Sequence, residues 1–320
     1  MNPVMIKMLN LYRKLNFSKM LAGLSVFVFL VVLNYYFGLK DFLMAEYFDP
    51  ENFDWPIKFN FSVDEGKLSN ITPINRFSNN PVVKSDIKTG SFKAFFVIKS
   101  AMNNFENRRI LRKTWLRDLQ LSSDNFEYVF SLGQTDNPKV NEEFQKENSI
   151  HHDMIKFNFI DTYFNNTEKL VRSFIYARNE ITMAKYRKTA FYIFCDDDYY
   201  VNFANLSSYL DNLLTTPALY NSTMPFCTGY VYKDSFPFRG ISSKWSVKLD
   251  EYKWSKWPPY PTAGFFILNQ IALDQINKVI PYTKLIKFDD IYLGILLNRL
   301  NLKPLHDERF AKNAPFRQSK

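Results

Sequence analysis

The stretch Ala190-Phe-Tyr-Ile-Phe-Cys-Asp-Asp-Asp-Tyr-Tyr-Val-Asn202 places three consecutive aspartates at the end of an apolar run. Such a run is typical of a buried strand. Asp196, Asp197 and Asp198 repel one another and aromatic residues follow them directly, so this strand end needs a positive charge among the carboxylates. Their oxygen atoms suit a divalent cation. The alternative is a solvated acidic turn, but no Gly, Pro, Ser or Asn follows before Asn202.

Segments of strand character alternate with segments of helix character up to this point in the chain. This alternation predicts an α/β domain with a mostly parallel central sheet flanked by helices, whose ligands bind at the carboxyl ends of the strands. The three aspartates lie at such an end. The predicted strands cover residues 92–100, 126–132, 155–159 and 192–195, and the predicted helices cover residues 108–119, 141–148 and 165–186.

An uncharged apolar segment near the N-terminus predicts a membrane anchor. Residues 20–38 contain no charged side chain and span about 28 Å as a helix, enough for a thin bilayer. A cleaved signal peptide is the alternative, but the segment ends in Asn34-Tyr-Tyr-Phe37 rather than in a small-x-small cleavage site. Paired tyrosines suit the membrane interface. We therefore expect a signal anchor.

The charges that flank this segment predict its orientation. Basic residues precede it and Asp41 and Glu46 follow it, which places the N-terminus in the cytosol. We expect a cytosolic tail at 1–19, a transmembrane anchor at 20–38, a luminal stem at 39–90 that is rich in proline and lacks periodicity, and a folded luminal domain at 91–320. Five glycosylation acceptors agree with a luminal location: Asn60, Asn70, Asn165, Asn205 and Asn221.

Composition and small motifs narrow the function. The net charge is +9, but four of these charges lie within the first 19 residues, so a nucleic-acid partner is not expected. The sequence contains neither of the two glycine-rich phosphate-binding motifs, G-x-G-x-x-G and G-x-x-x-x-G-K-[ST]. A bound diphosphate therefore needs a metal ion together with Arg or Lys. The two cysteines, Cys195 and Cys227, form either a disulfide in an oxidising lumen or two buried thiols on neighbouring strands.

Five motifs in order between residues 92 and 310 carry a resemblance to a known family. They are Arg108-Arg-Ile-Leu-Arg-Lys-Thr-Trp115, Asp161-Thr-Tyr-Phe-Asn-Asn-Thr-Glu-Lys169, Phe194-Cys-Asp-Asp-Asp-Tyr-Tyr-Val-Asn202, Ser243-Lys-Trp245 and Phe288-Asp-Asp-Ile-Tyr-Leu-Gly294. The chain resembles the β1,3-galactosyltransferases, Golgi enzymes that are related to the fringe proteins and include β1,3-N-acetylglucosaminyltransferases. The resemblance implies a GT-A nucleotide-sugar-binding fold, a UDP-sugar donor, a Mn²⁺ cofactor and inversion at the anomeric carbon.

The resemblance and the residue chemistry together suggest roles for the acidic residues. Asp196 and Asp198 are the expected metal ligands, and Asp196 and Asp197 are expected to bind the donor. Inversion without a covalent intermediate needs a base beside the acceptor hydroxyl. Asp290 is the candidate base, with Asp289 as the alternative. Both residues also begin an apolar helix, where an aspartate is favoured simply as a cap.

Four further residues are expected to bind the donor. Arg108 and Arg112 lie four residues apart on one helical face and could reach phosphate or the aspartates, although a solvated basic face is the alternative. The same two interpretations, contact with phosphate or the aspartates and a solvated basic side chain, apply to Lys169. Residues 244–261 form an aromatic segment, and Trp245 is the one residue of it that we expect to lie near the site.

The expected function is transfer of galactose or N-acetylhexosamine from a UDP-sugar to a hydroxyl, the 3-OH, of a glycan on a glycoprotein or glycolipid. We expect a single-pass type II protein of the Golgi membrane with a luminal catalytic domain. Two departures from the family pattern support an alternative, an inactive membrane-anchored relative that binds glycan or nucleotide. Phe265 occupies a position where the family usually has glycine, and none of His151, His152 and His306 matches a histidine that resembles a metal ligand in relatives.

Overall fold

The computed structural model describes residues 3–55, 92–122, 126–162, 165–183, 189–241 and 243–311. The chain divides into two units: Met1–Phe53 with Asp234–Trp257 form the first, and Asp54–Lys233 with Pro258–Lys320 form the second. Most of the predicted stem, residues 56–90, lies outside the described residues, as do two of the glycosylation acceptors, Asn60 and Asn70.

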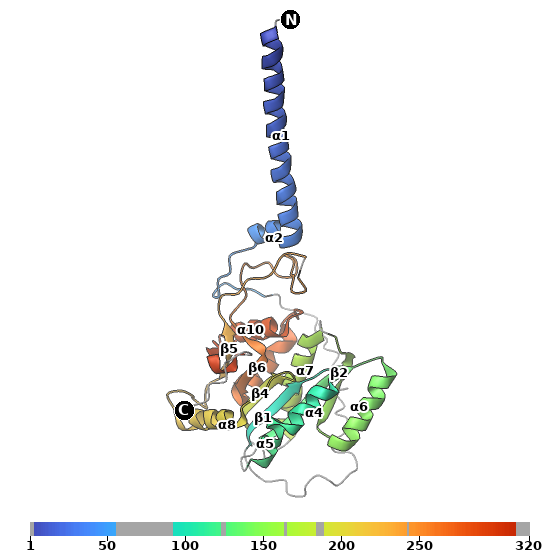
Figure 1. Cartoon of the computed structure of the whole chain (residues 1–320). Helices are drawn as coiled ribbons and strands as arrows, with labels where there is room; N and C mark the ends of the chain where they lie inside the picture. The colour runs from blue at the N-terminus through green and yellow to red at the C-terminus, as the bar shows by residue number, and fades with distance from the viewer. Residues whose placement is uncertain are drawn as a thin grey trace, which may run out of the picture. The chain divides into compact units, whose positions relative to one another are not determined.

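A seven-stranded sheet forms the centre of the second unit, in the order β3-β2-β1-β4-β6-β5-β7 (Figure 1). The first four strands pair in parallel, whereas β6 runs antiparallel to both of its neighbours, β4 and β5. The predicted α/β class and mostly parallel sheet are confirmed. The strands are β1 (Phe92–Lys99), β2 (Phe126–Gln134), β3 (Met154–Ile160), β4 (Thr189–Asp196), β5 (Cys227–Tyr232), β6 (Tyr260–Asn269) and β7 (Leu305–His306).

Helices lie against both faces of this sheet. The predicted helix at 108–119 is two helices that meet at Thr114, whose hydroxyl donates to the Ile110 carbonyl at 2.8 Å. Threonine hydroxyls compete in this way with the helical hydrogen bonds, and the chain turns here to bury Trp115. The helices are α4 (Phe105–Lys113), α5 (Trp115–Leu121), α6 (Pro138–His151), α7 (Asn166–Met183), α8 (Phe203–Thr215), α9 (Gln270–Val279) and α10 (Asp289–Arg299).

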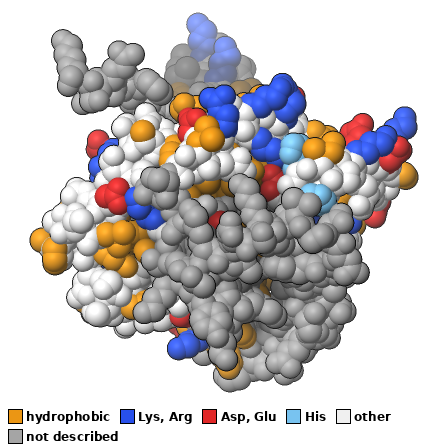
Figure 2. Space-filling view, turned by 90° about the horizontal axis from the view of Figure 1, so that it is seen from below, with side chains coloured by type: hydrophobic (Ala, Val, Ile, Leu, Met, Phe, Trp, Pro, Cys, Tyr) orange, Lys and Arg blue, Asp and Glu red, His pale blue; other side chains and the backbone are white. Residues whose placement is uncertain are grey.

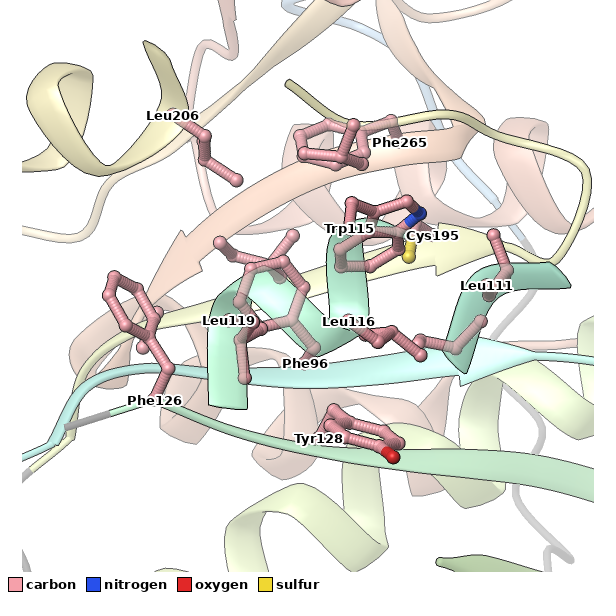
Figure 3. Packing of buried hydrophobic residues seen from close by; sticks show 14 of the residues in the cluster. Phe96, Leu111, Trp115, Leu116, Leu119, Phe126, Tyr128, Cys195, Leu206 and Phe265 are labelled. Carbon is pink, nitrogen blue, oxygen red and sulfur yellow. The ribbon is translucent and has the colours of Figure 1, made fainter. Parts of the chain in front are cut away.

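The two faces of the sheet bury different apolar clusters. On one face, side chains of α5 and α8 cover Phe96 of β1, Cys195 of β4 and Phe265 of β6, with Trp115 among them (Figure 3). On the other face, Phe194 of β4 stacks on Phe266 of β6, with ring centroids 5.1 Å apart. Helices α7, α9 and α10 contact the sheet or one another beside it. This packing holds the carboxyl ends of the central strands in fixed register.

The first unit contains the predicted anchor. Helix α1 (Pro3–Phe37) includes a 26-residue segment, Tyr12–Phe37, that is long and apolar enough to cross a membrane. Gly38 follows with a φ of 68°, a left-handed conformation that favours glycine, and α2 (Leu39–Met44) begins there. A side chain at Gly38 would collide with Arg239, whose guanidinium donates to the carbonyls of Val247, Tyr252 and Trp254 in the same unit.

The described surface carries both signs of charge. Figure 2 shows basic and acidic side chains at several separate places on one face, between apolar side chains. Exposed ion pairs such as Lys146–Glu142 and Arg178–Asp274 join oppositely charged side chains elsewhere on the second unit. Surface pairs of this kind contribute little to stability.

Candidate active site at the carboxyl ends of β1 and β4

A buried lysine lies among the carboxylates that end β4. Lys99 ends β1 and is the register partner of Asp196 in β4. Its Nζ atom lies 3.0 Å from Asp196 Oδ1 and 2.6 Å from Asp289 Oδ2. The positive charge that the sequence required among the aspartates is thus supplied, at least in part, by a neighbouring strand. Lys99 joins the end of β4 to the start of α10.

Electrostatics keep Lys99 charged. Burial alone would lower the pKa of Lys99, but the adjacent Asp196 and Asp289 carboxylates outweigh burial and raise that pKa above its ordinary value. Sequence reasoning missed this residue. The available signal was a lysine at the end of an apolar strand, since charged residues that end parallel strands meet at one edge of the sheet.

Asp197 has an anchoring position. It is buried, and its carboxylate accepts hydrogen bonds from Ser100 Oγ at 2.5 Å, Asn104 Nδ2 at 2.9 Å and Asn107 Nδ2 at 3.2 Å. Its backbone N–H donates to the carbonyl of Lys99 at 3.0 Å. These bonds fix the turn that follows β4 to the segment that follows β1. Contact of Asp197 with the donor stays a prediction.

The two predicted arginines lie in a buried ion-pair network. Arg108 is fully buried and donates through Nη2 to Glu147 Oε2 at 2.6 Å. Arg112 donates through Nη1 to Glu147 Oε1 at 2.6 Å and through Nε to Asp153 Oδ2 at 2.8 Å. The alternative of a solvated basic face is wrong. We call Arg108, Arg112, Glu147 and Asp153 the arginine network.

Arg108 also reaches the aspartate turn through one hydroxyl. Its Nη1 donates to Ser100 Oγ at 2.8 Å. A serine hydroxyl has a single proton. Ser100 Oγ accepts the hydrogen bond from Arg108 and donates its own proton to Asp197. Lys169 supports the same segment, because its Nζ donates to the Ser100 carbonyl and pairs with Asp161, both at 2.8 Å. Whether these residues also bind a donor stays a prediction.

Asp196 and Asp198 retain exposed surface at the edge of the sheet. The side chain of Asp196 is 38% exposed, and Asp198 is exposed. Among the residues that the structure describes, no group of three or more His, Cys, Asp or Glu side chains is arranged to hold a metal ion. The two carboxylates therefore offer an incomplete set of oxygen ligands, which a diphosphate and water could complete.

The two acids that begin α10 have different partners. Asp289 is paired with Lys99, whereas Asp290 Oδ1 accepts a hydrogen bond from the backbone N–H of Ile291 at 2.8 Å. The N-cap position of α10 is Phe288, without a side-chain cap hydrogen bond, so the two acids lie in the first turn of the helix and are not its cap. Burial, and then the charge of Asp289, raise the pKa of Asp290 to about 7. A carboxyl group with this pKa can exchange a proton near neutral pH. We call Lys99, Asp196, Asp198, Asp289 and Asp290 the carboxylate edge.

The sequence also singles out Trp245 and Phe265, which belong to different units of the chain. Trp245 is 55% exposed and belongs to the first unit, and its place near the site stays a prediction. Phe265 pairs with Cys195 and is buried in the core, where its ring stacks on Phe310 with centroids 5.2 Å apart. The side chain at this unusual position thus fills the core. The adjacent Gly264 has no room for a side chain beside Tyr199.

The cysteines are free thiols. Cys195 lies in β4 and Cys227 in β5, and β6 separates these two strands. Two strand spacings amount to about 9.6 Å, beyond the Cα separation of about 7 Å that a disulfide tolerates. The disulfide alternative is therefore wrong, whereas the alternative of two buried thiols is confirmed except that β6 separates their strands. Burial raises the pKa of both thiols.

Comparison with known proteins identifies the family. The family model described as Galactosyltransferase matches residues 106–308. Beta-1,3-galactosyltransferase brn of Drosophila melanogaster is 34% identical over 219 residues, which cover 68% of this chain and 64% of that protein. Beta-1,3-galactosyltransferase bre-5 of Caenorhabditis elegans is 27% identical over 300 residues, which cover 94% of this chain and 86% of that protein.

A third relative has a different transferase name. Lactosylceramide 1,3-N-acetyl-beta-D-glucosaminyltransferase of Rattus norvegicus is 30% identical over 215 residues, which cover 65% of this chain and 54% of that protein. The matched part is thus less than two thirds of the fly and rat proteins. The family model nevertheless covers more than half of the present chain. The chain therefore belongs to the galactosyltransferase family, in agreement with the five motifs that resemble β1,3-galactosyltransferases.

Proposed function

We propose that this protein is an inverting hexosyltransferase with a GT-A fold. It transfers galactose or N-acetylhexosamine from a UDP-sugar to a glycan hydroxyl, the 3-OH, on a glycoprotein or glycolipid. The observation that carries the proposal is Lys99, which pairs with Asp196 and Asp289 and so brings the aspartate turn and the start of α10 to one place. Family membership supports the donor class and the reaction type.

Donor binding uses the exposed part of the carboxylate edge. Asp196 and Asp198 would hold Mn²⁺, which when bound acts as a Lewis acid and neutralises charge on the departing diphosphate. The buried Asp197 fixes the turn that carries both ligands. Arg108 donates to the Ser100 hydroxyl and Lys169 donates to the Ser100 carbonyl, so both residues support this turn through Ser100. We expect these two residues to act on donor binding through the turn.

Asp290 is the proposed general base. The acceptor oxygen forms a bond to the anomeric carbon, the bond from that carbon to the diphosphate oxygen breaks, and the hydroxyl proton passes to Asp290. Asp289 is less suited to this role because its carboxylate is paired with the charged Lys99. The raised pKa of Asp290, about 7, lets its carboxylate accept the proton more readily than an ordinary aspartate.

The membrane arrangement remains part of the proposal. Residues 1–19 form a cytosolic tail, residues 20–38 the anchor, residues 39–90 a luminal stem and residues 91–320 the transferase domain. Helix α1 supports this division because it contains an apolar segment long enough to span a bilayer. The resulting type II topology places the transferase domain in the Golgi lumen, where glycan acceptors pass.

A second candidate is a noncatalytic relative that binds nucleotide or glycan. It is favoured by one observation: Asp196 is already paired with Lys99. The test uses the full chain in detergent with Mn²⁺, UDP-galactose or UDP-N-acetylhexosamine, and methyl β-glycosides. Acceptor-dependent release of UDP supports the transferase. Metal-dependent UDP binding by calorimetry without any release supports the second candidate.

A further inference from the structure

Four ring side chains meet at the end of β5. Tyr230 contacts Tyr232 with ring centroids 5.4 Å apart and His306 with centroids 4.9 Å apart, and Tyr232 contacts Tyr260 with centroids 5.6 Å apart. We call these four residues the aromatic platform. Tyr260 is buried, whereas Tyr232 is 46% exposed and His306 is exposed. The platform therefore rests on the core at one end and meets solvent at the other.

The platform and the carboxylate edge lie at the same edge of the sheet. Because β6 is antiparallel to both β4 and β5, these two strands run in the same direction and end at the same side. Cys195, one residue before the end of β4, pairs with Phe265, and Val231 pairs with Pro261 nearer the start of β6. The end of β5 thus extends beyond the end of β4 on the side where Asp196 lies.

Helix α10 connects the platform to the proposed base. A side chain at Gly294 would place its Cβ 2.7 Å from Cβ of Tyr260, so the helix and the platform are in direct contact there. Gly294 follows Asp290 by four residues, which places both on one helical face about 6 Å apart along the axis. One helical turn therefore separates the base from the inner end of the platform.

His306 gives the platform a defined polar group. The backbone N–H of Val231 donates to its Nδ1 atom at 3.0 Å, so in this geometry the Nδ1 atom carries no proton. The ring proton of the neutral imidazole is then on Nε2, which can donate a hydrogen bond. Tyrosine rings bring apolar faces together with hydroxyl groups. Apolar ring faces beside N–H and O–H groups match a pyranose, which has C–H groups on its faces and hydroxyls around its rim.

We propose that the aromatic platform binds a hexopyranoside ring of the acceptor glycan, with Tyr232 as the main stacking residue. This proposal rests on the proposed transferase function, since it locates the acceptor beside Asp290. All four residues of the platform belong to the second unit. A side chain at position 294 would clash with Tyr260 and disturb the platform.

The test measures acceptor and nucleotide binding separately on the full chain in detergent. Saturation-transfer NMR with methyl β-D-galactoside and methyl β-D-N-acetylglucosaminide reports sugar binding, and calorimetry with UDP and Mn²⁺ reports nucleotide binding. Tyr232→Ala should weaken binding of the better glycoside by roughly three- to tenfold, the usual range for loss of one aromatic contact. UDP affinity should not change. Tyr232→Phe should bind the glycoside like the parent chain.

Tyr282→Ala is the matched control, because Tyr282 is an exposed tyrosine of the same unit in a short 3-10 helix, Ile280–Tyr282. It should leave glycoside binding unchanged. If Tyr232→Ala binds the glycoside as well as the parent does, or if Tyr282→Ala is equally impaired, the platform is not the acceptor site. A parent chain that binds UDP but neither glycoside overturns the platform and leaves the nucleotide site intact. Failure to bind UDP as well rejects the proposed function itself.

Discussion

The arginine network and the carboxylate edge are both dense groups of charge in the second unit, and they differ in balance. The network contains two arginines and two carboxylates that satisfy one another, with Arg108 fully buried. The edge contains one lysine and four carboxylates, and Asp198 is exposed. Removing one partner from a balanced, enclosed group leaves an uncompensated buried charge and destabilises the fold. A group with excess negative charge at the surface can bind a cation and hold a proton.

The sharpest test of this difference is Asp290→Asn in the carboxylate edge. The variant should retain UDP-sugar binding and lose turnover by roughly 10²- to 10⁴-fold, the usual contribution of a positioned general base. Asparagine keeps the size of aspartate and is tolerated equally well at a helix start, so the variant should remain folded. Initial rates of UDP release at saturating donor provide the measurement.

Asp289→Asn is the control for Asp290→Asn, since it removes one negative charge from the same helix start. We expect a smaller loss of turnover, transmitted through the altered partner of Lys99. If both variants transfer sugar at the parent rate, or if Asp289→Asn alone is inactive, Asp290 is not the base.

In the arginine network, Arg108→Met should act on stability. It leaves the buried Glu147 with one arginine partner fewer and should lower the free energy of unfolding by about 3–5 kcal/mol, the cost of breaking a buried ion pair. Chemical unfolding of the detergent-solubilised chain measures the effect. Arg109→Met is the neighbouring control: Arg109 is 52% exposed and pairs with exposed Glu106, so its loss should matter little. Equal stability of both variants would contradict the structural role of the network.

Asp198→Ala tests the metal-binding part of the carboxylate edge. In the presence of Mn²⁺, the variant should weaken UDP binding by at least roughly 10- to 100-fold. This is the cost of losing a residue that only supports a metal ligand by a hydrogen bond. Its UDP affinity in EDTA should equal that of the parent, because EDTA removes the metal ion from both proteins. Calorimetry measures both affinities. An unchanged Mn²⁺-dependent affinity would eliminate the proposed metal site.

The smallest expected effect is a pH dependence that arises from Asp290. Its side chain must be ionised to act as a base, and its pKa is about 7, so turnover at pH 6 should be about tenfold below the plateau at high pH. Besides burial, the charges of Asp289 and Lys99 act on the pKa of Asp290. A pH–rate profile without a break between pH 6 and 8 would contradict this role.

Stability should change in the opposite direction over a lower pH range. The folded-state pKa of Asp290 is raised above the ordinary value of about 4. Between these two values the folded chain binds more protons at this site than the unfolded chain does. The contribution of Asp290 to stability therefore decreases as the pH rises from about 4 to about 7, and Asp290→Asn should remove that slope from a series of unfolding measurements.

Much of this fold follows from local sequence patterns. Apolar runs of strand length, and helices whose apolar residues recur with a period of 3.6, predicted the alternating elements and the strand that ends at Asp196. The two acids at the start of α10 were predicted in the same way. These features depend on neighbouring residues, whose order is visible in the sequence. The five motifs added the family, because they occur in a fixed order.

Tertiary structure alone decided which charged residues meet. Lys99 reaches Asp289 across 190 positions of the chain because strand pairing brings β1 beside β4 and packing brings α10 to the end of both. Arg108 and Arg112 have the spacing of a basic helical face, but Glu147 and Asp153 from a later segment neutralise them in the interior. The antiparallel strand β6 likewise separates Cys195 from Cys227. The sequence by itself determined the family, most elements up to Asp196 and helix α10, whereas strand order, register and burial, which depend on packing of the whole sheet, decided the partners.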